Sequence, residues 1–216
     1  MEEKTRIEVP TNLADGQGRD GYMSINESIN KKIYGYDYAR LAMDLEEARK
    51  EGKKIVMSSG TFDLFHIGHM RMLNAAKSFG DILIVAVKSD RAAALKKEDP
   101  PVIDEKNRME TVANCISSDY VIMVDYDINH WAKGYSIDNT SSFEWLTMFD
   151  PAVEMIKPDI FVHEDNPVIV KARQQLFNRH GVEGIIQPRT PGISTTQLID
   201  TIKTRLLISM QRNSMK

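Results

Sequence analysis

Continuous apolar runs alternate along the chain with segments in which apolar residues recur every three or four positions. The runs cover residues 54–57, 82–87, 120–124, 159–162 and 184–186, and Ile and Val dominate most of them. Such runs are typical of parallel strands that are buried on both faces of a sheet. The alternation therefore predicts an α/β fold with a doubly wound parallel sheet of about five strands and right-handed crossovers.

Helices are expected where the apolar spacing is helical and capping residues mark the ends. Asp37 is a suitable N-cap for a helix over residues 37–51, which Gly52 would end. Further helices are expected over 69–79, 104–117 and 168–179. These helices would lie between consecutive strands, as the crossovers of a parallel sheet require.

The domain organisation follows from shifts in composition. Residues 1–30 are rich in polar residues and glycine and are interpreted as a flexible N-terminal extension, followed by an N-terminal helical segment over 31–52. Residues 53–212 form the expected α/β domain. Within it, the aromatic-rich segment 126–150 interrupts the pattern and is interpreted either as a loop lining an acceptor pocket or as a surface lobe.

Composition and charge exclude several function classes. The 216 residues include 28 basic and 31 acidic side chains, with a net charge of −3. Because no basic excess exists, a nucleic-acid partner is not expected. The single Cys115 excludes an internal disulfide and a cysteine-based zinc site. The sequence shows neither a signal peptide nor a run long enough to span a membrane, so a cytoplasmic protein without a membrane partner is expected.

The first candidate site is Ser58-Ser59-Gly60-Thr61-Phe62-Asp63-Leu64-Phe65-His66-Ile67-Gly68-His69. It joins the end of a predicted strand to the start of a predicted helix, where unpaired N–H groups and a partial positive charge favour phosphate. Gly68 allows a phosphate to approach the backbone closely, because no Cβ intrudes. His66 and His69 add two imidazoles that are able to donate hydrogen bonds.

A second candidate site begins at Arg189 and runs Arg189-Thr190-Pro191-Gly192-Ile193-Ser194-Thr195-Thr196-Gln197. Ser194 and Gln197 have the spacing of a capping box, which predicts the start of a C-terminal helix. The simplest interpretation is a well-capped helix. Three consecutive hydroxyl residues after an arginine also suit a second phosphate-binding helix start.

The stretch from Gly60 to His69 matches the first motif of the cytidylyltransferase-like nucleotidyltransferases, and Arg189 to Thr196 resembles their last motif. The resemblance covers roughly residues 53–205. It implies a Rossmann-like fold and an enzyme that moves a nucleotidyl group from CTP or ATP to a phosphorylated sugar or polyol, releasing pyrophosphate. It also implies a homodimer and a Mg²⁺ ion that bridges phosphates. Two roles are open for Asp63: it would either position this ion or brace the turn.

The resemblance also implies roles for individual residues. His66 and His69 would contact the triphosphate and stabilise the transition state, and Lys97, with Lys96 as the alternative, would approach the α-phosphate. Nucleotide contacts are expected from both motifs, at Gly60, Thr61, Phe62, Asp63, Gly68, Arg189, Thr190, Gly192, Ile193, Ser194, Thr195 and Thr196. Acceptor contacts are expected from Lys96, Arg108, Trp131, Lys133 and Asp165.

Two subgroups of the family are similar to this chain. The segment Leu45-Glu46-Glu47-Ala48-Arg49-Lys50-Glu51-Gly52-Lys53 resembles a pattern of the heptose-1-phosphate adenylyltransferases, whereas the two motifs resemble glycerol-3-phosphate and phosphoethanolamine cytidylyltransferases. Three features depart from these subgroups: Glu164-Asp165 in place of Gly-Asp, Pro100-Pro101 in place of Arg-Pro, and the length of 126–150. Base and acceptor therefore stay open.

Two other functions compete with this interpretation. Class I aminoacyl-tRNA synthetases share the sequence His66-Ile67-Gly68-His69, but this chain lacks their second lysine-rich motif, room for tRNA-binding domains and a basic charge. A non-catalytic nucleotide-binding regulatory module would keep the same fold. The full set of histidine, glycine and hydroxyl donors favours the enzyme over the module, because binding alone does not require it.

Overall fold

The computed structural model describes residues 27–94, 101–126 and 140–214, and its centre is one parallel sheet. The sheet has six strands: β1 (Ile33–Gly35), β2 (Ile55–Gly60), β3 (Ile82–Lys88), β4 (Tyr120–Val124), β5 (Ile160–His163) and β6 (Glu183–Ile186). Their spatial order is β1-β4-β3-β2-β5-β6, and every pair is parallel. The predicted α/β parallel sheet is confirmed.

The chain reverses its direction of travel across the sheet beside β2. From β2 the chain moves outward through β3 and β4 on one side, and then returns to add β5 and β6 on the other. β2 and β5 are therefore the neighbours at which the strand order reverses. Open α/β sheets bind their ligands at the carboxyl ends of such strands, because the crossover helices diverge there.

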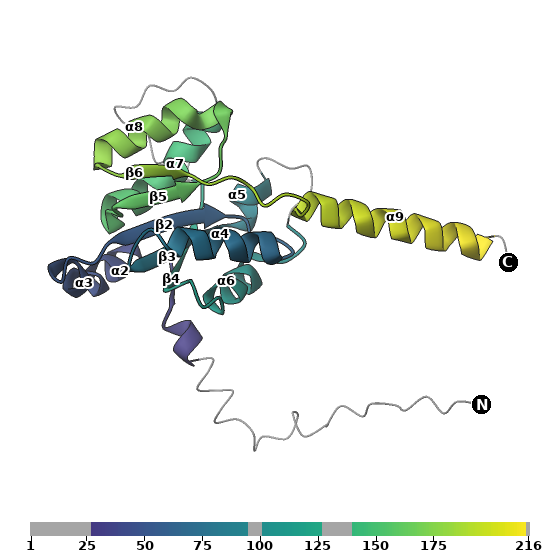
Figure 1. Cartoon of the computed structure of the whole chain (residues 1–216), viewed down its shortest axis with the longest axis horizontal. Helices are drawn as coiled ribbons and strands as arrows, with labels where there is room; N and C mark the ends of the chain where they lie inside the picture. Colours follow the sequence, from purple (N-terminus) through teal and green to yellow (C-terminus); the bar gives the residue numbers. More distant parts are fainter. Residues whose placement is uncertain (1–26, 95–100, 127–139, 215–216) are drawn as a thin grey trace, which may run out of the picture.

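Helices cover both faces of the sheet (Figure 1). One hydrophobic cluster packs alternate strand residues such as Met57 and Ile84 against α2 (Tyr38–Asp44), α7 (Thr140–Ile156) and α8 (Val170–His180). The other cluster packs the intervening residues, such as Val56 and Val85, against α4 (Ile67–Lys77) and α6 (Glu105–Ala113). The strands are apolar on both sides because both sides are buried. The predicted doubly wound arrangement is confirmed.

The N-terminal segment differs from the prediction. Residues 31–52 were expected to be helical, but residues 33–35 form the sixth strand, β1, which pairs with β4. The helical part is divided at Leu45 into α2 and the short α3 (Glu46–Lys50). Asp37 caps α2 as predicted, because its carboxylate accepts a hydrogen bond from the Arg40 N–H. Three strand residues at a sheet edge are too few for an alternation pattern to reveal.

The aromatic-rich segment 126–150 is not uniform. Residues 127–139 lie outside the described residues, whereas Thr140 begins α7, and Trp145 and Phe149 of that helix belong to the hydrophobic core. The second half of the segment is therefore an element of the fold and not a surface lobe. The short α5 (Asp90–Ala94) and the 3₁₀ turn η2 (Pro167–Ile169) complete the domain.

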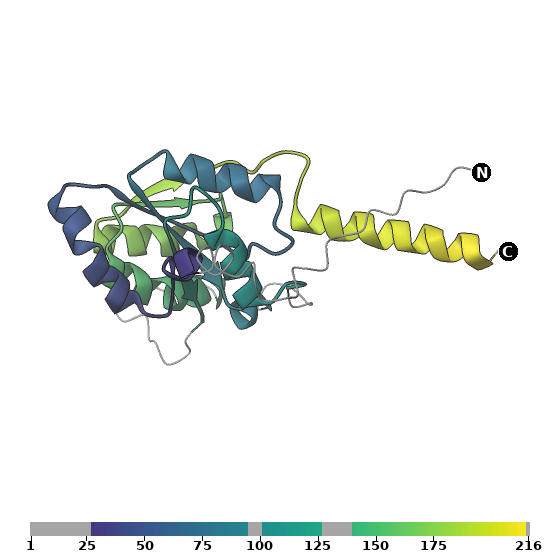
Figure 2. The same ribbon diagram turned by 90° about the horizontal axis from the view of Figure 1, so that it is seen from below.

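The last helix, α9 (Thr195–Ser214), stands away from the domain in both views (Figures 1 and 2). It begins at the carboxyl edge of the sheet, and its residues from position 200 onward are exposed. The exposed residues include large apolar side chains, namely Ile202, Leu206, Leu207 and Met210. Of the helices within residues 27–94, 101–126 and 140–214, none has the length and hydrophobicity that a bilayer crossing requires.

Candidate active site

A cleft of about 400 Å³ lies at the carboxyl ends of β2 and β5. It brings together most of the residues that both sequence motifs supply, and it extends to α7 and α8 on the far face of the sheet. The predicted site residues that line it are Gly60, Thr61, Phe62, Asp63, His66, Gly68, His69, Asp165, Arg189, Thr190, Ile193, Ser194, Thr195 and Thr196.

His66 and His69 form a reciprocal cap at the start of α4. The Gly68 N–H donates to Nδ1 of His66 at 3.1 Å, and the His66 N–H donates to Nδ1 of His69 at 3.3 Å. The two rings are stacked with their centroids 3.9 Å apart. Because each Nδ1 accepts a hydrogen bond, each neutral ring carries its proton on Nε2. The cap therefore fixes both histidines as Nε2–H donors.

Burial keeps this pair of histidines neutral. Burial, and then the neighbouring His66, lower the pKa of His69 to about 4, while Asp63 opposes that shift. Burial also lowers the pKa of His66. Because the uncharged ring predominates at neutral pH, the site offers two hydrogen-bond donors without placing two like charges side by side. Negative charge that develops on a bound phosphate would favour protonation of either ring.

The pH dependence of the free protein follows from His69. Its pKa of about 4 lies below the ordinary 6.5, so the unfolded chain takes up this proton first. The free energy of unfolding should therefore fall as the pH is lowered from 6.5 toward 4. An NMR titration of the His69 ring should give the low pKa, and inorganic tripolyphosphate should raise it. A pKa near 6.5 in the free protein would contradict the buried, neutral assignment.

The turn between β2 and α4 is strained. Phe62 and Leu64 have φ values of 58° and 44°, in the left-handed region that side chains disfavour. Asp63 holds the turn, because its carboxylate accepts from the N–H groups of Leu64, Val102 and Ile103 at 3.0 to 3.1 Å. The side chain is 3% exposed. The two roles expected for Asp63 are thereby separated: it braces the turn, and its oxygens are already engaged.

Phe62 has a supporting position at the base of the cleft. It is 1% exposed, and its ring meets the His69 ring edge-on with the centroids 5.4 Å apart. Its aromatic face therefore holds the imidazole in place and offers little surface to a nucleotide. Gly68 leaves the space in front of His66 open, because a Cβ there would lie 2.9 Å from the His66 ring.

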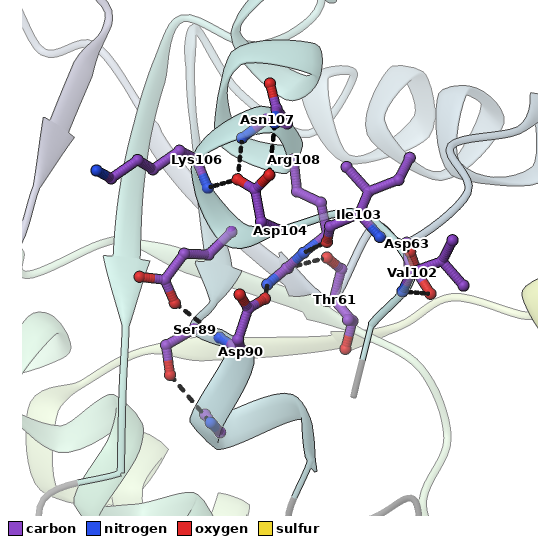
Figure 3. Close-up of polar contacts among 12 residues, drawn as sticks. Thr61, Asp63, Ser89, Asp90, Val102, Ile103, Asp104, Lys106, Asn107 and Arg108 are labelled. Carbon is purple, nitrogen blue, oxygen red and sulfur yellow. Dashed lines mark hydrogen bonds and ion pairs between the residues drawn. The ribbon is translucent and has the colours of Figure 1, made fainter. Parts of the chain in front are cut away.

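Arg108 corrects the sequence-based expectation of an acceptor contact. Its side chain is fully buried beneath the turn and does not line the cleft (Figure 3). Its guanidinium donates to the carbonyl oxygens of Thr61 and Ile103 and pairs with Asp90 at 2.7 Å. The side chain thus points inward from α6, away from any acceptor substrate. Arg108 is a positioning residue for the strained turn.

The second motif is attached directly to the first. Thr195 donates from Oγ1 to the carbonyl oxygen of Asp63 at 2.9 Å. Ser194 accepts from the Gln197 N–H at 3.2 Å, so the predicted cap of the last helix is present. Gly192, with φ of 77°, makes the turn that precedes it and does not line the cleft. Thr196 is the third hydroxyl and also lines the cleft.

Arg189 and Glu164 form an ion pair at the mouth of the cleft. The guanidinium nitrogens lie 2.6 and 2.7 Å from a Glu164 carboxylate oxygen. Both side chains are at least partly exposed, so the pair is in contact with solvent. An anion that binds Arg189 has to compete with Glu164.

Several predicted residues cannot be placed. Lys96, Lys97, Trp131 and Lys133 lie outside the described residues. The roles predicted for them therefore stay predictions.

One part of the cleft, formed by α7, α8 and the ends of β5 and β6, was not expected from the sequence. Trp145, His163, Arg173 and Gln187 line this part. Arg173 had a detectable signal, because it falls among Ile169, Ala172 and Leu176 on the buried side of its helix. A charged residue at such a position is more often functional than one on the solvated side.

A comparison with family models matches residues 57–201 to the cytidylyltransferase-like family. The bifunctional protein HldE of Nitratiruptor sp. is 36% identical over 169 residues, which cover 78% of this chain and 32% of that protein. The bifunctional protein HldE of Geobacter metallireducens is 43% identical over 88 residues, 40% of this chain and 18% of that protein. The chain thus spans a third or less of the length of these relatives.

Among solved structures, the pantoate-beta-alanine ligase of Francisella tularensis has a TM-score of 0.52 at 15% identity, covering 74% of this chain and 68% of that one. At this identity the likeness concerns the fold alone. It agrees with the parallel sheet and flanking helices described above.

Proposed function

Because the chain belongs to the cytidylyltransferase-like family of nucleotidyltransferases, we propose that it transfers a nucleotidyl group from a nucleoside triphosphate to a phosphorylated sugar and releases pyrophosphate. One observation carries the proposal. Both histidines use Nδ1 within the chain and keep an Nε2–H donor, in a cleft shared with the hydroxyl residues that start α9. A site that only bound a nucleotide would need no such pair.

The chemistry requires stabilisation of charge more than removal of a proton. The attacking oxygen belongs to a phosphate, which is already ionised at neutral pH. Negative charge develops on the α-phosphate and the leaving pyrophosphate, and fixed donors in a water-poor cleft stabilise it most effectively. His66 and His69 would donate to these oxygens, and Arg189 and Thr196 would hold the triphosphate from the other motif.

We propose that the reaction uses Mg²⁺, which would supply neutralisation of charge on the leaving group when bound with the nucleotide. Among the described residues, the carboxylates that line the cleft are Asp63, Glu164 and Asp165. Asp63 is engaged by three N–H groups and Glu164 by Arg189, so Asp165 is the one best suited to the water shell of the ion.

For the substrates we propose ATP and heptose 1-phosphate. The similarity to two bifunctional HldE proteins and the pattern from Leu45 to Lys53 support this pair. The alternative is CTP with glycerol 3-phosphate, which the sequence of the last motif supports. Glu164 stands where both subgroups have glycine, and its carboxylate lines the cleft, so we propose that it alters the contacts to the base or the metal ion.

The proposal is tested with a matrix of five nucleoside triphosphates against sugar, polyol and amino-alcohol phosphates, read by pyrophosphate release. The expected result is release with ATP and heptose 1-phosphate, at a rate well above every other pair. Release with CTP and glycerol 3-phosphate would refute the proposed substrates but would agree with the proposed reaction. Calorimetric binding of nucleotides without release on any acceptor would refute the enzyme and favour a regulatory module.

We further propose a homodimer in which α9 pairs antiparallel with its copy. Ile202, Leu206 and Met210 are each about 60% exposed on this helix, more apolar surface than a lone helix usually offers to water. An antiparallel pair centred on Leu206 would bring the Ile202, Leu206 and Met210 side chains of the two copies together and remove them from water. The apolar stripe of α9 is therefore the surface that we expect the two copies to share.

The dimer gives a prediction for light scattering coupled to size exclusion. The wild-type protein should have twice the monomer mass at micromolar concentration, and Leu206→Glu should halve it by placing two carboxylates at the centre of the pair. Thr204→Glu, which adds a charge on the opposite side of the same helix, should remain dimeric. A monomeric wild-type protein, or a dimeric Leu206→Glu variant, would exclude this interface.

A further inference from the structure

Arg173 is a buried cation for which the chemistry described above has no use. It lies on α8, lines the cleft and is 7% exposed. Its Nε is buried and makes no hydrogen bond to any of the residues that the structure describes. Trp145 is its aromatic neighbour, with the guanidinium carbon 6.0 Å from the ring centroid.

An arrangement of this kind is costly for a protein without a ligand. A buried charge loses its hydration, and only a close opposite charge or hydrogen bonds restore what is lost. Burial lowers the pKa of Arg173, which Asp165 and Glu164 offset in part. Neither carboxylate forms an ion pair with Arg173 among the described contacts, since Glu164 pairs with Arg189. The position is suited to an anion that arrives from outside.

The neighbouring basic groups do not duplicate this charge. His163 donates from Nδ1 to the Glu164 carbonyl oxygen at 3.0 Å, and burial lowers its pKa, so the ring is neutral. Arg189 is exposed and already paired. Arg173 therefore supplies the buried positive charge on the side of the cleft that α7 and α8 form.

Arg173 and the two catalytic histidines belong to opposite faces of the sheet. His66 and His69 start α4, which covers one face, whereas α8 covers the other. The cleft crosses the carboxyl edge between them. Phosphoryl-type transfer places the attacking and leaving oxygens roughly in line on opposite sides of phosphorus. With the triphosphate held at the histidines, an attacking phosphate would come from the side of Arg173.

We propose that Arg173 binds the phosphate group of the acceptor, an inference that rests on the proposed nucleotidyl transfer. A guanidinium presents parallel N–H donors that match two phosphate oxygens, and a phosphate would satisfy the unpartnered Nε. Gln187 adds a buried Oε1 with no partner among the described residues, in the same cleft. That oxygen accepts from a hydroxyl, so the acceptor is a phosphorylated polyhydroxy compound.

Isothermal titration calorimetry tests this without turnover. Inorganic tripolyphosphate with Mg²⁺ first occupies the triphosphate end, and glucose 1-phosphate and glycerol 3-phosphate are then titrated. Arg173→Met should weaken both phosphate esters about tenfold or more, the scale of a lost charge-assisted pair, and leave tripolyphosphate affinity within about twofold. Arg173→Lys, which keeps the charge but not the paired donors, should fall between. Lys171→Met, a loss of exposed charge on the same helix, is the control.

Three outcomes overturn the inference. Equal affinities in the wild type and Arg173→Met would show that Arg173 only packs against Trp145. A larger loss for tripolyphosphate than for the esters would place Arg173 at the nucleotide. A wild-type protein that binds neither ester under these conditions also refutes it. Arg173→Gln replaces Arg173→Met if the latter does not fold. Pyrophosphate release is measured separately, so the proposed function could stand while this inference fails.

Discussion

His69→Ala should lower turnover by about 10² to 10³-fold while changing triphosphate affinity much less. Removing one preorganised donor to a developing oxyanion costs this much in other enzymes. The Nε2–H of His69 is fixed by the cap that its own Nδ1 forms with the His66 N–H. Because the interaction strengthens as charge develops, the loss should appear in kcat and not in binding.

His69→Asn separates the donor from the cap in this experiment. Asn offers an oxygen for the His66 N–H but places no donor where Nε2 stands, so its turnover should be as low as that of the alanine variant. Steady-state kinetics and calorimetry with the triphosphate measure the two effects. Turnover restored by Asn would mean that His69 only caps the helix, and near wild-type turnover for alanine would remove its catalytic role altogether.

Arg108→Met should lower the free energy of unfolding by about 2 to 4 kcal/mol, because a buried acceptor that loses its donor costs about 1 to 3 kcal/mol. The fully buried guanidinium satisfies two backbone carbonyl oxygens and pairs with Asp90. Met fills much of the volume but leaves these acceptors without donors. The turn that holds Thr61 would relax with them, so activity should fall in the molecules that remain folded.

Urea unfolding, followed by pyrophosphate release under folding conditions, measures both parts of this prediction. Lys106→Met is the matched control, since Lys106 lies on the same helix and is exposed. Its effect should stay within about 0.5 kcal/mol, as for most surface changes. A similar loss for the two variants, or none for Arg108→Met, would contradict the positioning role of the buried arginine.

The parts of the fold that the sequence revealed are those with long patterns. The run Ile82–Val87 is buried on both sides, and its composition shows this without any partner being known. Asp37 and Ser194 cap their helices as expected, because a cap depends only on residues three positions away. Strand β1 was not predicted, because three residues at a sheet edge are too few to show a periodic pattern. Its pairing with β4 depends on residues that are distant in sequence.

The site could be predicted where its residues are neighbours in sequence. His66, Gly68 and His69 cap one helix turn, so their local spacing contains the geometry. Arg108 and Thr61 meet across the sheet edge, and the direction of an arginine side chain is decided by packing that no local pattern encodes. Arg173 is a second example. The sequence pattern shows that Arg173 lies on the buried side of its helix, but it does not show that a cleft lies in front of that side.

Helix α9 has a mechanical consequence for how this protein could be studied. It is anchored at the Thr195 contact with Asp63, and its 20 residues extend about 30 Å away from the domain. A rotation of about 10° at that anchor would move the far end by roughly 5 Å, because the displacement grows with the length of the helix. A pair of fluorophores, one near Arg212 and one on α3, would therefore report rearrangement of the two motifs at a distance, without touching either.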